Sequence, residues 1–89
     1  MASYLLVRSK VQHFDAWKKA YDAHLPVRKE YGLDEEHLLR AADDPNDVVL
    51  LFKVSNVDRA KAFMANPSVR EAIEKSGVVG KLDAHFLNS

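Results

Sequence analysis

The sequence predicts an α+β fold in which four strands form an antiparallel sheet and helices cover one face of it. Three observations predict this fold: an apolar run at 48–52, a dense turn signal just before it at 43–47, and two long amphipathic segments elsewhere. The chain has 89 residues, which is enough for one small domain. We therefore expect a single domain over residues 1–89.

The first two elements are a strand and a helix. Residues 4–11 are predicted to form a strand, in which Leu5 and Val7 lie on one face and Tyr4 and Leu6 on the other. A helix is predicted over 14–31, where Gly32 provides the C-terminal stop. Pro26 lies inside this helix and cannot donate a backbone hydrogen bond, so we expect a kink or a break near it.

A hairpin follows the helix. Strands are predicted at 33–41 and 48–54, and the residues between them at 43–47 read Asp-Asp-Pro-Asn-Asp, a dense cluster of turn formers. The 48–52 run is apolar on both faces, so this strand must be covered on both sides.

The last elements are a broken helix and a strand. Ser55 is expected to cap the helix, and Gly77 to end it. Pro67 should restart the helix at a first helical position, with Asn66 as its cap. A final strand is predicted at 82–87.

This order of elements is the split βαβ, ferredoxin-like pattern βαββαβ. Right-handed crossovers place both helical regions on one face of the sheet, so the other face stays bare. The strand at 48–54 is apolar on that bare face too, and large exposed apolar patches are rare in monomers. We therefore expect a homodimer in which two sheets pack face to face.

Composition limits the classes of function. The formal net charge is zero, which gives no electrostatic reason for a nucleic-acid or membrane partner. No stretch approaches the roughly 20 apolar residues of a membrane span. The chain has no cysteine and no closely spaced histidine ligands, so we expect no metal site. A cytoplasmic protein without a cofactor is expected.

The first helix carries the best candidate site. Aromatic and polar residues recur there at spacings of three and four, beside a stripe of small residues, and the two stripes merge into one broad buried arc. His24 should lie near the middle of that arc and Arg28 inside it. Because unpaired buried polar groups are costly, we expect both to line a ligand pocket.

Each residue of this pocket has an expected role. Trp17 and Tyr21 would supply apolar walls for a ligand. His24 is the candidate catalytic residue, a general base or acid, because imidazole titrates near neutral pH. Arg28 would hold an enolate, phenolate or carboxylate oxygen. In the alternative interpretation, His24 bonds a backbone carbonyl and Arg28 extends to solvent from the helix end.

Two further histidines are candidate ligand-binding residues on strands. His37 should share a strand face with Leu39, and His85 should share one with Leu87. Either histidine could face the pocket or the dimer interface, and the sequence leaves the choice open.

Several short motifs combine with the element order to indicate a family. They are Asp15-Ala16-Trp17 with His24, Arg-Lys-Glu-Tyr-Gly at 28–32, the turn at 43–47, and Ser-Gly-Val-Val-Gly at 76–80. With them, nearly the whole chain resembles the dimeric α+β barrel proteins of the antibiotic-biosynthesis-monooxygenase-like superfamily. The resemblance implies a dimer with a pocket between helices and sheet in each subunit.

Members of this superfamily include cofactor-free monooxygenases acting on aromatic polyketides or quinols, polyketide cyclases and haem-degrading enzymes. The resemblance disfavours haem degradation, because those enzymes pair a first-strand asparagine with a histidine on the second helix. Here the matching strand holds Ser9, and the second helix has no histidine.

Two functional hypotheses follow. In the first, the homodimer binds a small, largely apolar or aromatic molecule, and any catalysis is proton transfer, a cyclase-like reaction or cofactor-free oxygenation centred on His24. In the second, the protein is a non-catalytic ligand-binding or dimerisation module.

Overall fold

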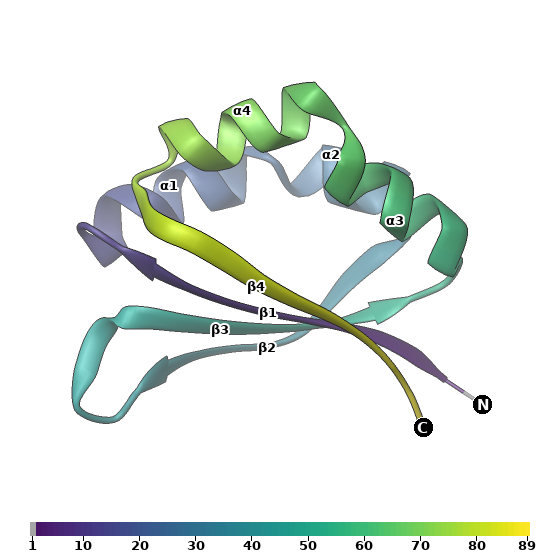
Figure 1. The fold of residues 1–89 in the computed structure, drawn as a ribbon, viewed down its shortest axis with the longest axis horizontal. Helices are drawn as coiled ribbons and strands as arrows, with labels where there is room; N and C mark the ends of the chain where they lie inside the picture. The colour runs from purple at the N-terminus through teal and green to yellow at the C-terminus, as the bar shows by residue number, and fades with distance from the viewer. Residues whose placement is uncertain (1) are drawn as a thin grey trace.

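The computed structural model describes residues 2–89 and contains one four-stranded antiparallel sheet (Figure 1). The strand order is β2-β3-β1-β4, which confirms the predicted ferredoxin-like α+β fold. The elements are β1 (Ser3–Val11), α1 (Phe14–Ala23), α2 (Leu25–Glu30), β2 (Leu33–Ala41), β3 (Asp44–Val54), α3 (Val57–Ala65), α4 (Pro67–Lys75) and β4 (Val78–Asn88).

All four helices cover the same face of the sheet, and the opposite face is bare (Figure 1). The core lies between these two layers. Alternate residues of the two central strands point toward the helices and are buried. They are Leu5, Val7, Ser9 and Val11 on β1, and Val48, Leu50, Phe52 and Val54 on β3.

The predicted helix break occurs at His24, two residues before Pro26. His24 ends α1 and also caps the start of α2, with its backbone N–H donating to the carbonyl of Tyr21 at 3.2 Å. This placement puts Pro26 in the first turn of α2, where no intrahelical partner is needed for its missing N–H.

Helix capping follows the prediction at one helix and departs from it at another. Asn66 caps α4 as predicted, accepting from Ser68 N at 2.9 Å. The cap of α3 is Asn56, which accepts from Arg59 N at 3.1 Å, so the prediction of Ser55 was wrong. The Ser55 hydroxyl donates instead to the carbonyl of Gly32.

Two strands begin earlier than predicted. β3 begins at Asp44, so the turn is shorter than the run of turn formers suggested. β4 begins at Val78 rather than at 82, and its pairing with β1 shifts register between Arg8 and Lys10. Gly80 lies in this irregular stretch and has φ +75°, a backbone conformation that glycine adopts without steric cost.

None of the helices in residues 2–89 is long and apolar enough to cross a bilayer.

Candidate functional site

A cavity of about 90 Å³ lies between the helices and the inner face of the sheet. Its walls are largely apolar and include Leu50 and Phe52 of β3, Phe63 of α3 and Ile73 of α4. A single buried water needs on the order of 10–15 Å³ in the same measure, so the space suits a small organic molecule.

Three residues of α1 and α2 form a stacked row along one wall. The rings of Trp17 and Tyr21 stack with centroids 4.9 Å apart, and the Arg28 guanidinium carbon lies 3.7 Å from the centre of the Tyr21 ring. Trp17 and Tyr21 are four residues apart on one face of α1, and Arg28 of α2 contacts Tyr21 across the break at His24. The structure therefore brings these three predicted residues together at the cavity.

Arg28 is the most unusual group in this row. Only 6% of the residue is exposed, and burial lowers the pKa of Arg28 from its ordinary value. Its Nη1 donates to the carbonyl of Tyr21 at 2.6 Å, and no carboxylate in residues 2–89 lies within ion-pair distance of it. Glu35 and Asp22 stabilise the charge of Arg28 only from beyond ion-pair distance. A buried cation without a carboxylate in direct contact, beside an apolar cavity, favours an anionic ligand.

The Tyr21 hydroxyl is held by β2. It donates to Oε1 of Glu35 at 2.7 Å. Burial, reinforced by this hydrogen bond, raises the pKa of Tyr21, so the hydroxyl stays protonated at neutral pH. Tyr21 thus acts as a fixed wall that positions Arg28, and it is not suited to accept a proton.

His24 lies at the mouth of the cavity rather than in the buried arc. The residue is exposed, and it borders both the cavity and a surface depression beside α4 lined by Ala72 and Ser76. The prediction of a buried His24 was wrong, because the buried face of α1 is narrower than the predicted arc and His24 occupies the break between α1 and α2. The predicted stripe of small residues comprised Ala16, Ala20, Ala23 and Val27, and of these Ala16 and Ala23 are exposed as well.

His37 and His85 lie on the opposite face of the sheet, away from the cavity. Strand pairing places them at the ends of one row, His37-Leu51-Leu6-His85, that crosses all four strands. The register of β2 shifts between Glu35 and His37, so strand alternation alone could not assign the face of His37. Of the two faces left open for these histidines, the structure selects the one predicted to form the dimer.

Ser9 is a cavity residue that sequence reasoning did not select. It lies on the inner face of β1, is only 5% exposed and lines the cavity. Its alternation with Leu5, Val7 and Val11 was the available signal, because it placed a hydroxyl on an otherwise apolar strand face.

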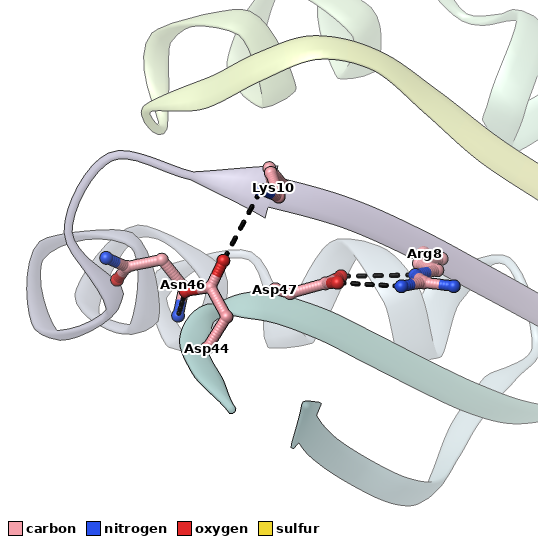
Figure 2. Close-up of polar contacts among 5 residues, drawn as sticks. All are labelled: Arg8, Lys10, Asp44, Asn46 and Asp47. Atoms are coloured by element: carbon pink, nitrogen blue, oxygen red, sulfur yellow. Dashed lines mark hydrogen bonds and ion pairs between the residues drawn. The ribbon is translucent and has the colours of Figure 1, made fainter. Parts of the chain in front are cut away.

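A polar cluster lies at the end of the sheet beside the β2–β3 hairpin (Figure 2). Arg8 donates to Asp47 through Nε at 3.2 Å and through Nη2 at 2.7 Å, and Lys10 lies 3.4 Å from Asp44. The hydrogen bond from Arg8 lowers the pKa of Asp47. Asn46 Oδ1 accepts from Phe14 N at 3.0 Å, so this cluster ties the hairpin to the start of α1 and has a structural role.

Sequence comparisons found no matching family model and no matching curated protein. Solved structures share the fold over nearly the whole chain. A protein from Bordetella bronchiseptica, provisionally named an antibiotic biosynthesis monooxygenase, has a TM-score of 0.78 at 14% identity and covers 99% of this chain and 96% of its own.

Two further structures give the same result. SnoaB, described as a cofactor-independent oxygenase from Streptomyces nogalater, has a TM-score of 0.75 at 14% identity, covering 99% of this chain and 92% of its own. A protein from Nitrosomonas europaea, with the same provisional name as the Bordetella protein, has a TM-score of 0.70 at 19% identity, covering 98% and 97%. The predicted resemblance is confirmed at the level of fold, and identities this low show the fold alone.

Proposed function

We propose that the protein is a homodimer that binds one small, largely apolar or aromatic molecule per subunit in the cavity between helices and sheet. The observation that carries this proposal is Arg28, a buried guanidinium stacked on Tyr21 beside an apolar space and without a carboxylate partner among the described residues. Burying a guanidinium without a carboxylate contact is costly, and the hydrogen bond to the Tyr21 carbonyl uses one of its donors, so its other N–H groups favour an anionic ligand.

The walls and the charge together suggest what the ligand looks like. The stacked rings of Trp17 and Tyr21 offer a flat apolar surface that suits an aromatic ring. Arg28 would receive an enolate, phenolate or carboxylate oxygen.

The bare face of the sheet supports the homodimer. Leu6, Val49 and Leu51 are only partly buried there, and Leu39 and Leu87 are exposed. An apolar face of this kind is typical of an interface, and a second copy of the same sheet would cover it.

Catalysis, if the protein has it, is proposed to use His24 as a general base at the cavity mouth. It would take the proton of a bound hydroxyl. The resulting anion would either attack a carbonyl carbon of the same molecule, whose oxygen takes up the proton as the ring closes, or react at carbon with O₂, the oxidant, to give a hydroperoxide that loses water and leaves a ketone, without a cofactor. The shared fold with SnoaB, described as a cofactor-independent oxygenase, favours the oxygenation alternative. A non-catalytic ligand-binding or dimerisation module in the cytoplasm is the second candidate.

Trp17 provides a direct test, because it is the single tryptophan of the chain. Its indole N–H should give one NMR cross-peak, and titration with 2-naphthoate should shift that peak to saturation. Arg28→Gln should weaken binding by about tenfold or more, the effect of losing a charged hydrogen bond.

Lys19→Gln is the matched control, since it removes a positive charge from the exposed side of α1. A Trp17 cross-peak that does not move on titration would reject the proposed site. Equal binding to the Arg28 and Lys19 variants would reject the role of Arg28.

A further inference from the structure

Ser9 stands out on the inner face of the sheet. The other buried inward-facing residues of β1 and β3 are all apolar, yet Ser9 is as buried as its neighbours Val7 and Val11. A hydroxyl in apolar surroundings costs free energy unless it finds a partner.

The protein itself supplies no partner for this hydroxyl within residues 2–89. Ser76, the other serine that lines the cavity, donates its hydroxyl to the carbonyl of Ile73 at 2.5 Å, so its bonding is satisfied by the fold. No fully enclosed side-chain polar atom of the described chain lacks a partner, so the Ser9 oxygen retains open surface, and Ser9 opens onto the cavity.

The sheet is irregular at this residue. Ser9 pairs with Val48 of β3, but the pairing with β4 passes from Arg8–Asp83 to Lys10–Val79 and skips Ser9. Bulges of this kind re-aim side chains and are common beside binding sites. Ser9 therefore lies on the sheet side of the cavity, whereas Arg28 comes from the helix side.

We infer that the ligand is an aromatic acid with a second oxygen function, whose anionic group binds Arg28 and whose hydroxyl or carbonyl oxygen binds Ser9. This inference rests on the proposed function and narrows it to one chemical class. The Ser9 hydroxyl can donate and accept, so it pairs with either kind of oxygen. Arg28, which has no carboxylate contact among residues 2–89 and uses Nη1 for the Tyr21 carbonyl, keeps further donors for an anion, and Ser9 offers a hydroxyl from the sheet side, so one such molecule can bind both groups.

Three probes separate the two polar contacts. 6-Hydroxy-2-naphthoate carries both groups, 2-naphthoate lacks the hydroxyl, and 6-hydroxy-2-naphthamide lacks the charge. 4-Hydroxybenzoate and benzoate repeat the comparison with a shorter spacing. Dissociation constants come from the Trp17 indole cross-peak and from calorimetry.

The matched variants are Ser9→Thr and Ser9→Val, which have nearly the same shape and differ in the hydroxyl. The melting temperatures of Ser9→Thr and Ser9→Val should be close to each other, since both introduce a β-branched residue that suits a strand. In the wild type and in Ser9→Thr, a hydroxy acid of matching length should bind roughly three- to tenfold more tightly than its deoxy analogue, the effect of one hydrogen bond. In Ser9→Val this preference should vanish.

The outcomes separate this inference from the proposed function. If aromatic probes shift Trp17 but neither the charge nor the hydroxyl matters, the cavity function stands and the inference is wrong. If Ser9→Thr and Ser9→Val show the same preference for a hydroxy acid over its deoxy analogue, the inference is also wrong, because Ser9 would then bind only water. If no probe binds, both the proposed function and this inference fail.

Discussion

Arg28 shows how the surroundings of one residue decide its chemistry. Its spacing from Tyr21 brings the guanidinium over the ring, and burial then removes the water that would otherwise solvate it. The sequence predicted the row of Trp17, Tyr21 and Arg28 because helical periodicity is a local property. The same pattern predicted that His24 is buried, whereas the structure leaves it exposed at the helix break.

The role of His24 is tested by the variant His24→Gln. With 1,4-dihydroxy-2-naphthoate as substrate, the wild type should accelerate O₂ uptake, and the variant should lose about 10²-fold or more of that rate, the range for general bases. The dissociation constant should change much less than the rate, because His24 lies at the mouth of the cavity and glutamine keeps a polar side chain there. An oxygen electrode measures the rate.

His13→Gln is the control for this experiment, because His13 is exposed before α1. Equal rates for wild type and the His24 variant would remove His24 from catalysis. A wild type no faster than buffer would favour the non-catalytic module.

The Arg8–Asp47 ion pair should make the free energy of unfolding depend on pH in the acid range. The pKa of Asp47 is lowered in the folded state by its hydrogen bond from Arg8, so this contribution to stability is present above the unfolded value of 3.8. It is lost as the pH falls through the lower, folded pKa. Asp47→Asn should be less stable at pH 7 and should lose less stability between pH 5 and pH 2, as measured by urea unfolding.

Asp34→Asn, at an exposed position on β2, is the matched control and should behave like the wild type. An Asp47 variant with the same pH profile as the wild type would contradict the role of the ion pair. The effect should be small and sensitive to salt, because the Arg8 side chain is 61% exposed.

At the scale of elements, the hydrophobic pattern predicted the order, the hairpin and the side of the sheet that the helices cover. These features follow from alternation and turn chemistry along the chain. Register shifts were not predictable, because they depend on how two distant strands pair. They place His37 on the bare face and interrupt the pairing of β4 at Ser9. The cavity itself is a product of packing and leaves no local sequence signal.

Filling the cavity from α4 distinguishes a binding site from a well-packed core. Ala72 lines the cavity, so Ala72→Leu should place extra methyl groups in empty space. We expect unchanged or increased stability in urea unfolding, together with weaker binding of 2-naphthoate. Ala62→Leu, on the exposed side of α3, should leave binding unaltered. A loss of about 1–3 kcal/mol in Ala72→Leu would instead indicate a filled core.

At the scale of the whole molecule, the sheet is covered on one face only (Figure 1). Leu6, Val49 and Leu51 make the centre of the bare face apolar. The run at 48–52 predicted that both faces of the sheet must be covered, because both faces of this strand are apolar. The proposed partner is a second copy of the chain, because no helix or strand of residues 2–89 covers this face.

Leu39→Asp tests the dimer without disturbing the monomer core. Leu39 is 55% exposed on the bare face, so a charge there is tolerated in a monomer and is costly in a face-to-face dimer. Sedimentation at micromolar concentration should show that the variant dissociates. Leu25→Asp changes a leucine of similar exposure, 44%, on α2 and should remain dimeric. Equal masses for the two variants would contradict the proposed interface.

Native mass spectrometry with 2-naphthoate tests the whole account most directly, because one spectrum reports both assembly and occupancy. The account predicts the mass of a dimer that gains two ligand masses as the acid is added, one per cavity, with Arg28→Gln remaining a dimer that stays largely empty. A monomer at micromolar concentration whose mass is unchanged by the acid would contradict it.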